Sequence, residues 1–454
     1  MAAPPLDGVR AYSVAFGVAF LQMTVLGTYT CYPVYNNLLH NDEGLGRPSL
    51  TTLASAESIV LGIIPTVGVG MGIGCDKFGP TWVVLLSSLC IAGVGLLTPF
   101  AQSIEAFLGI YSTFMGIACA CIVAPGPATL GTWFSGEKVS IGMGIGEAGS
   151  AIGTSILPVI SGALVDQFGE WRIVFRYMSI VAVVPLLCAF VVKPRPGAEE
   201  GDGDAGDHEK GLLNGSGGGS GEAAQINNTM SVWGCIRTPQ FIGLFVGQLL
   251  FAFAYFSVLY IGIPFARRFG TAGTTYAGYP LIGLEAASTL LTFFGAANAA
   301  GAVLLGLLAS KLNNRLVFSV AMAVLGILFS LWTVADQWWQ LAILFFLMGF
   351  ACAGGLACLP SMVVETFMGP NLNTLMSLSF VGFGVGGLCG PPISSALVTS
   401  DGSFTYSIVV IAFAVVIASG SVFVLMGLPA HHFHGTPELP EDEQHAAQGH
   451  AINH

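Results

Sequence analysis

The chain has 454 residues, of which 54% are hydrophobic and only 9% are charged, whereas about 25% of the residues in soluble chains are charged. The mean hydropathy is +0.77. This composition excludes an ordinary soluble domain and predicts that the chain sits in a membrane. The net charge of -11 comes largely from a linker and a tail, so it gives no support for nucleic-acid binding.

Apolar runs can be read as membrane spans because only helices and closed barrels satisfy every backbone group in lipid, and a helix needs about 20 residues to cross it. Six runs occupy 11–33, 52–74, 81–100, 107–130, 139–165 and 173–192. Six more occupy 241–264, 287–309, 316–334, 340–362, 374–398 and 405–428. We expect an all-α integral membrane protein with twelve transmembrane helices, and neither a metal nor a cofactor.

Two polar segments divide the chain into four parts. Residues 193–238 contain an acidic stretch and a Gly-rich stretch, which cannot bury enough apolar surface to fold alone. The expected order is therefore an N-terminal six-helix bundle (1–192), a disordered linker (193–238), a C-terminal six-helix bundle (239–428) and a disordered, acidic, His-containing tail (429–454).

The distribution of basic residues predicts the orientation. An even number of spans places both termini and the linker on one side, and that side carries nine of the fourteen Lys and Arg residues. By the positive-inside rule it is the cytoplasmic side. The plasma membrane is the expected location, with an organelle membrane as the alternative.

The two halves are internal repeats. One constant shift along the chain superposes Met115, Gly116, Ala118, Cys119 and Ala120 on Met348, Gly349, Ala351, Cys352 and Ala353. The agreement continues without gaps over four helices, as in Gly149 with Gly382 and Gly153 with Gly386. Two parallel six-helix repeats are the architecture of major-facilitator transporters.

The turn after the second span carries a motif that resembles one of that family. Gly72, Asp76, Lys77 and Gly79 match the loop pattern GxxxD(R/K)xG, and the resemblance implies a gating motif. Gly72 permits close helix approach, Gly79 permits a tight turn, and Asp76 can cap the positive end of a neighbouring helix. We expect Asp76 to contact the start of the eleventh span near Asn371. The equivalent position in the second half is Ser310.

Finer motifs resemble the monocarboxylate-transporter-like and oxalate–formate-antiporter-like branch. They are Trp133-Phe134 with Lys138, followed by Ala148-Gly149-Ser150, and later Gly390-Pro391-Pro392-Ile393. The resemblance covers most of the chain outside the linker and tail, and implies a small organic anion as solute.

Three charges typical of the proton-coupled members of that branch are missing. Their positions correspond to Asn298, Ala302 and Val34. No fixed cation is therefore visible at mid-membrane depth, which puts a monocarboxylate substrate in doubt.

Polar residues within the spans are candidates for a substrate or proton pathway because such groups are costly in lipid and should face the bundle interior. They are Gln22, Tyr29, Tyr32, Glu57, Glu147, Gln248, Tyr255 and Asn298. The alternative for Gln22, Gln248 and Asn298 is ordinary hydrogen bonding between helices. Tyr29 and Tyr32 have the alternative of marking the outer membrane interface.

Glu147 stands out within this set because it lies near the midplane, about 12 Å from the cytoplasmic boundary at roughly 1.5 Å per helical residue. With no Lys or Arg at that depth, it could gain and lose a proton as the cavity alternates between sides. The alternative is a permanently protonated carboxyl that bonds a neighbouring helix. Glu57 is a poorer candidate because it lies nearer the outer surface.

The functional hypothesis is a secondary transporter of a small solute, with alternating access and protons as a candidate coupling ion, in contact with the lipid bilayer. The alternatives are transport of neutral amino acids or other neutral solutes, and a nutrient receptor that carries no flux. An enzyme is not expected, since no intramembrane Ser/His pair or metal triad is visible. No nucleotide-binding loop is present either.

The orientation predicts the glycosylation state. The Asn-x-Ser/Thr acceptor sites, Asn214 and Asn227, both lie in the linker, which we place in the cytoplasm. We expect no glycan at either site. Treatment with a glycosidase should leave the mass unchanged, and a glycosidase-sensitive shift assigned to either site would contradict the orientation.

Overall fold

The computed structural model describes residues 6–32, 38–40, 42–48, 50–123, 125–136, 138–195, 232–267, 272–276, 279–281, 284–335, 337–367, 371–398 and 404–427. Most of the predicted linker and the predicted tail lie outside these residues, as do Asn214 and Asn227. Within them, twelve helical segments are long and apolar enough to cross a membrane. This confirms the predicted fold class.

The first half contains six spans. They are formed by α1 (Val9–Tyr29), α3 (Leu50–Phe78), α4 (Pro80–Leu97), α5 (Ile104–Val123) with α6 (Pro125–Trp133), α7 (Lys138–Phe168), and α8 (Arg172–Val181) with α9 (Val183–Val191). Two 3₁₀ turns, η1 (Glu43–Leu45) and η2 (Thr98–Phe100), lie in connections. The sixth span is therefore built from two helices, α8 and α9, which lie on either side of Ala182.

The second half repeats this plan. Its spans are α12 (Pro239–Arg267), α13 (Leu284–Ala309), α14 (Asn314–Leu331), α15 (Trp338–Phe367), α16 (Leu372–Ala396) and α17 (Thr405–Leu425), with the turn η5 (Trp332–Val334) after α14. The short helix α11 (Val232–Ile236) precedes α12, in a stretch that the sequence had placed in the linker. A two-stranded antiparallel hairpin, β1 (Ala272–Tyr276) and β2 (Tyr279–Leu281), joins α12 to α13, which the all-helical prediction did not include.

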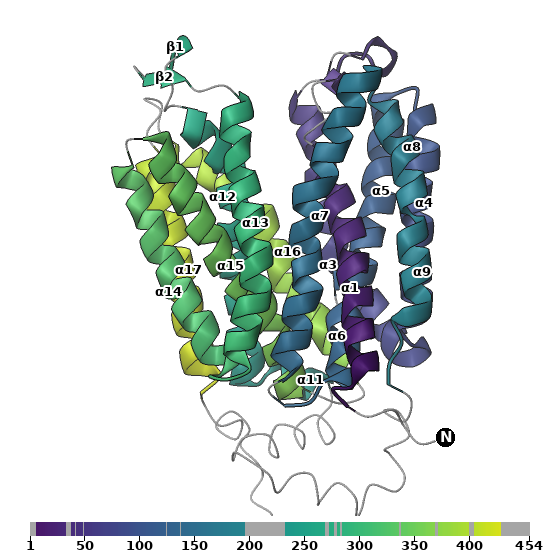
Figure 1. Cartoon of the computed structure of the whole chain (residues 1–454), viewed down its shortest axis with the longest axis vertical. Helices are drawn as coiled ribbons and strands as arrows, with labels where there is room; N and C mark the ends of the chain where they lie inside the picture. Colours follow the sequence, from purple (N-terminus) through teal and green to yellow (C-terminus); the bar gives the residue numbers. More distant parts are fainter. Residues whose placement is uncertain are drawn as a thin grey trace, which may run out of the picture.

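The two halves stand side by side (Figure 1), with the purple-to-blue N-terminal half and the green-to-yellow C-terminal half approaching each other at the end where α1 begins. We call this end the terminal side. Hydrogen bonds gather several chain segments there: Asp7 N–H donates to the Trp133 carbonyl (3.1 Å), and the Trp133 indole donates to the Lys193 carbonyl (2.7 Å). The hairpin β1–β2 lies at the opposite end, the far side.

In each half the first spanning helix, α1 or α12, touches another helix through the backbones. In the first half, a Cβ added to Gly149 or Gly153 of α7 would overlap the carbonyl groups of Ala19 and Met23 on α1. In the second half, a Cβ on Gly382 of α16 would lie 2.6 Å from the Phe245 carbonyl oxygen of α12. Only glycine permits such an approach.

The same crossings extend the internal repeat to the first helix of each half. Gly149 and Gly153 correspond to Gly382 and Gly386 at the constant shift that relates the later helices. The residues that they contact on α1 and α12 are related by a smaller difference in residue number, which pairs Ala19 with Phe245. The chain between the two crossing helices is thus longer in the second half, so a single gapless shift could not reveal this part of the repeat.

The halves meet along two seams of small residues. In the seam between α7 and α13, Gly306 approaches the Ser140 carbonyl oxygen, 2.7 Å from its added Cβ, and Gly144 lies against the carbonyl of Ala302. In the seam between α3 and α16, Gly72 lies against Ser377, and Gly384 against Pro65. Both seams include the helix ends on the terminal side, and in this structure the halves are joined there.

Asp76 supplies a polar link across the α3–α16 seam. Its carboxylate accepts hydrogen bonds from the backbone N–H groups of Asn373 (3.0 Å) and Thr374 (2.8 Å), which begin α16. It also accepts from the side chains of Asn373 (2.7 Å) and Thr374 (2.5 Å). Asp76 therefore caps the N-terminus of a helix that belongs to the other half. The contact falls two and three residues beyond Asn371, where the sequence placed it.

The rest of the motif serves the turn. Gly79 adopts φ +79°, the left-handed region that glycine tolerates, and Pro80 follows as the first residue of α4. Lys77 is exposed. Ser310, at the position equivalent to Asp76, donates to the Leu307 carbonyl of its own helix (2.7 Å), so this position supplies no acidic cap in the second half.

Asn314 forms a second polar link between the halves. The Asn314 side-chain nitrogen, at the start of α14, donates to the Ser140 hydroxyl of α7 and to the Glu365 carboxyl of α15, both at 2.6 Å. This link crosses between the halves on the terminal side. The sequence did not predict it, since Glu365 lies three residues beyond the predicted tenth span.

The far side of the first half is fixed by Asp42. Its carboxylate accepts from the Trp171 indole (2.5 Å), the Arg172 guanidinium (3.0 Å) and the Gly44 N–H (2.7 Å). Burial raises the pKa of Asp42, but the Trp171 hydrogen bond, the Arg172 charge and the Gly44 bond outweigh it and hold this pKa below its ordinary value. The connection between α1 and α3 is thereby tied to the start of α8.

The Asp76 cap can be tested by hydrogen exchange. In Asp76→Asn protein the amide would present N–H donors to a helix start that needs acceptors, so we expect the first turn of α16 to exchange about tenfold faster, equivalent to about 1.4 kcal/mol. We also expect the protein to interconvert more slowly between the two transport conformations. The measurement is amide hydrogen–deuterium exchange of the peptide containing Asn373 and Thr374.

Glu105→Gln provides the control for that experiment because Glu105 is exposed in the first turn of α5 and the change removes the same charge. Its α16 peptide should exchange at the wild-type rate. Unchanged exchange in folded Asp76→Asn protein would show that Asp76 does not hold the two halves together.

Candidate functional site

Gln22 and Glu147 form a buried pair where α1 crosses α7. The Gln22 amide nitrogen donates to a Glu147 carboxyl oxygen at 3.1 Å, and the two residues are only 3% and 9% exposed. The Gly149 and Gly153 crossing makes this pair possible because it brings the two backbones together directly beside it. The Gln22 carbonyl oxygen is buried without a hydrogen-bond partner in the described structure.

Gln248 occupies the equivalent position of the second half, by the same correspondence that pairs Ala19 of α1 with Phe245 of α12. Its amide nitrogen donates to the Ser379 hydroxyl of α16 at 3.2 Å. The carbonyl oxygen of Gln248 is also buried without a partner among the described residues. Gln22 and Gln248, which are related by the internal repeat, thus each donate from the amide nitrogen to a side chain on a neighbouring helix. The amide oxygen of each is left unpaired.

Tyr255 brings the second half close to Glu147. This residue of α12 lies near enough to the Glu147 carboxyl for the two groups to interact electrostatically. Its ring packs against Phe251, Phe256 and Phe294, with ring centroids 5.3 to 5.8 Å apart. Tyr29 is its counterpart in α1 by the correspondence that relates the two glutamines.

Asn298 lies on the face of α13 that meets α7. Gly295 and Ala302, three residues before it and four after it, contact Ser155 and Gly144 of α7, and residues at this spacing share one helix face. Asn298 is 2% exposed, and its side-chain oxygen has no hydrogen-bond partner in the described structure.

Glu57, Tyr29 and Tyr32 form a second group in the first half. Glu57 is half-buried on α3 and lies within electrostatic range of both tyrosines. Tyr32 is buried, donates to the Leu53 carbonyl (2.8 Å) and packs on the Tyr111 ring at 5.0 Å. These contacts favour a structural role for Tyr32. The eight predicted residues are therefore not one cluster.

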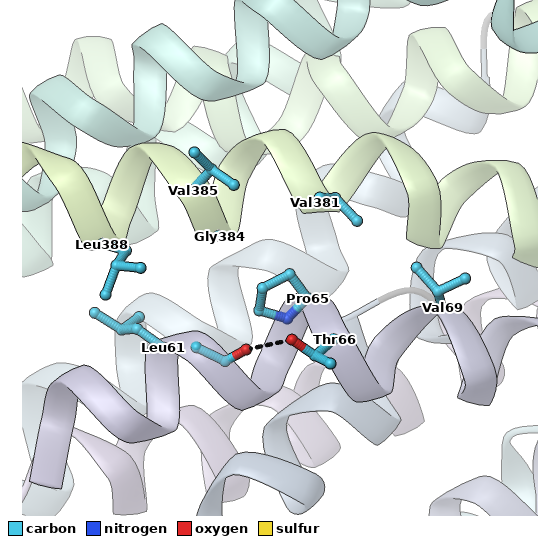
Figure 2. Close-up of a pocket in the computed structure, with 9 residues that line it drawn as sticks. Leu61, Pro65, Thr66, Val69, Val381, Gly384, Val385 and Leu388 are labelled. Atoms are coloured by element: carbon cyan, nitrogen blue, oxygen red, sulfur yellow. Dashed lines mark hydrogen bonds between the residues drawn. The ribbon is translucent and has the colours of Figure 1, made fainter.

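A cavity of about 390 Å³ lies at the seam between α3 and α16. Figure 2 shows Pro65 on α3 facing α16 near Gly384, with Leu61, Val381 and Leu388 around them. Thr66, the polar side chain of this lining, donates to the Gly62 carbonyl of its own helix (2.8 Å). The cavity is thus apolar and offers no hydrogen bond to fix the orientation of a solute.

No metal site is visible in the part of the chain that the structure describes, where no three His, Cys, Asp or Glu side chains are grouped to hold an ion. The ten cysteines are all free, and nine of them are buried. The cysteines act as small packing residues, which agrees with their scattered positions in the sequence.

Comparison with known proteins identifies the family. The Major Facilitator Superfamily profile matches residues 14–284 and 282–450. The riboflavin transporter RibJ of Trypanosoma cruzi is 30% identical over 93% of this chain and 94% of its own length. Monocarboxylate transporter 12 of Rattus norvegicus is 22% identical over 74% of this chain and 69% of its own length.

A solved structure agrees with this assignment at the level of the fold. The human organic anion transporter MFSD10 (TETRAN) superposes with a TM-score of 0.68 at 16% identity, covering 92% of this chain and all of that protein. Because profile, relatives and fold coincide over nearly the whole chain, the predicted family is confirmed. The chain is a multi-pass secondary transporter of the Major Facilitator Superfamily.

Proposed function

We propose that this protein transports riboflavin or a closely related uncharged heterocycle. The observation that carries the proposal is the 30% identity to a riboflavin transporter, which extends over 93% of this chain and 94% of the relative. Agreement along both full lengths includes all the spans that line a central site in this fold. It favours a shared solute more strongly than a match confined to one half.

The chemistry of the inner helices supports an uncharged solute. All fourteen Lys and Arg residues lie either outside the spans or within a few residues of a span end, so no cation stands at the depth of Glu147. Gln22, Gln248, Asn298 and Tyr255 instead offer neutral hydrogen-bonding groups. A flat ring system with carbonyl, N–H and hydroxyl groups can use these groups and can also stack on aromatic side chains such as Phe251.

A small organic anion, such as a monocarboxylate, is the second candidate. It is favoured by the relationship to monocarboxylate transporter 12 and by the Trp133-Phe134 and Gly390-Pro391 motifs. Against it stand the uncharged residues Val34, Asn298 and Ala302 at the three positions that carry charge in proton-coupled members of that branch. A carboxylate near Glu147 would also meet like charge.

Transport would proceed by rocking of the halves about the central residues. The seams and the Asp76 cap join the halves on the terminal side, which we place in the cytoplasm by its Lys and Arg content. On that assignment the structure represents a state closed to the cytoplasm. The plasma membrane is the favoured location, because uptake from outside the cell is the simplest use of such a protein, and an organelle membrane is the alternative.

Protons are the proposed coupling ion, with Glu147 as the group that carries them. The carboxyl is buried between α1 and α7 and within electrostatic range of Tyr255 of the opposite half. A titratable group between the halves can exchange its proton with either side as the halves rock. Glu57 instead lies within electrostatic range of Tyr29 and Tyr32 of its own half.

Uptake by purified protein in liposomes tests the solute. We expect labelled riboflavin to accumulate in proteoliposomes and unlabelled riboflavin to compete at least tenfold better than lactate or pyruvate, because one lost hydrogen bond costs about 1 kcal/mol and several are made. Protein-free liposomes and Glu105→Gln protein are the controls. Competition by monocarboxylates alone would favour the second candidate, and binding without accumulation would indicate a receptor.

Replacement of Glu147 by Gln tests proton coupling, since glutamine mimics the protonated carboxyl in shape and charge. We expect the variant to lose accumulation driven by a pH gradient while retaining exchange of internal for external solute. Glu57→Gln is the matched control and should retain both activities. Normal pH-driven accumulation by Glu147→Gln protein would remove Glu147 from the coupling mechanism.

A further inference from the structure

The amide of Gln22 can face a solute in two ways, and Glu147 decides which. An amide group has a donor end and an acceptor end. In the structure the Gln22 nitrogen faces Glu147 at 3.1 Å, and its carbonyl oxygen is buried without a described partner. The end of the amide that Glu147 does not use is the end available to a solute.

An ionised carboxyl and a protonated one make opposite demands on this amide. Ionised Glu147 can only accept, so the Gln22 nitrogen must face it, as observed. Protonated Glu147 carries an O–H that donates best to a carbonyl oxygen. A half-turn of the terminal Gln22 torsion, which has broad and roughly two-fold minima, would supply that oxygen and present the nitrogen to the solute.

Gln248 provides an internal reference that does not switch. Its nitrogen donates to the Ser379 hydroxyl oxygen at 3.2 Å. That hydroxyl donates its own hydrogen to the Met376 carbonyl (2.8 Å), so it can only accept a hydrogen bond from Gln248. The carbonyl oxygen of Gln248 therefore stays unpaired and directed away from Ser379 in every protonation state of Glu147.

The surroundings of Glu147 contain few other groups that could take its proton. Tyr255 of α12 is within electrostatic range, with Cys352 of α15 beyond it. Between Pro125 and Trp133 α6 has no titratable residue, and α13 has one, Glu285, in its first turn. On α1, the nearest tyrosine by sequence, Tyr29, interacts with Glu57. Arg172 and Arg176 of α8 lie at the far end of α7.

We propose that protonation of Glu147 switches Gln22 from hydrogen-bond acceptor to hydrogen-bond donor toward the solute, while Gln248 remains an acceptor. This inference rests on the proposed function, because the solute it suits is a heterocycle with a ring N–H between two carbonyls, as in riboflavin. Gln22 accepts from that N–H when Glu147 is ionised and releases it when Glu147 is protonated. Glu147 is a positioning residue in this step, since it acts on the solute through Gln22.

A methyl group on the ring nitrogen isolates this contact. Binding of riboflavin and of N3-methylriboflavin to purified protein can be followed by flavin fluorescence at the acidic and alkaline ends of the range in which the protein stays folded. At the alkaline end we expect wild-type protein to bind riboflavin about tenfold more tightly than N3-methylriboflavin, because the methyl group removes one hydrogen bond. The preference should fall toward parity at the acidic end.

Leucine variants at the two positions distinguish the contribution of Gln22 from that of Gln248. Gln22→Leu protein should bind both flavins equally at either pH. Gln248→Leu protein should bind both more weakly but keep the pH-dependent preference. A preference that does not change with pH in wild-type protein, or one that persists in Gln22→Leu protein, overturns the proposal.

Infrared difference spectroscopy supplies a readout that needs no solute. Acidification should produce the C=O band of a protonated carboxyl, which is assigned to Glu147 by its absence in Glu147→Gln protein. We expect this band to move in Gln22→Leu protein and to stay in place in Gln248→Leu protein. An unmoved band in folded Gln22→Leu protein contradicts the switch. If wild-type protein binds no riboflavin, the proposed function fails while this band still decides the switch.

Discussion

Direct backbone contact between helices is the constraint on which the rest of this structure depends. Where α1 crosses α7, the Ala19 and Met23 carbonyls occupy the space in which a Cβ of residue 149 or 153 would stand. Lipid gives no hydrophobic reason for helices to associate, so close packing of this kind must hold them. It also brings Gln22 and Glu147 within 3.1 Å. Removal of the glycines would thus separate the polar pair as well as the helices.

The fold could be predicted from the sequence because its signals are local. Apolar runs of sufficient length located all twelve spans, and one gapless shift of the chain against itself revealed the repeat. Features that depend on packing were not predicted, such as the division of the sixth span after Val181 and the hairpin at 272–281. The helix Val232–Ile236 was missed because its five residues are too short to show a periodicity.

The candidate site could be predicted only in part, because sequence indicates the depth of a residue in the membrane but not the direction in which it points. Gln22 and Glu147 were both selected for depth, yet nothing in the sequence showed that they pair. Tyr32 was selected for the same reason and instead bonds the Leu53 carbonyl. Glu365 was passed over because the tenth helix continues to Phe367, beyond the end of its apolar run.

The seam between α7 and α13 has a consequence for the rate at which the two halves reorient. Helices that pack through large side chains interlock as ridges and grooves, and relative movement requires those side chains to change rotamer. Gly144, Ala148, Ala302 and Gly306 leave this seam almost without ridges. One helix can therefore roll on the other with little steric resistance, so this long interface adds little to the activation barrier for reorientation.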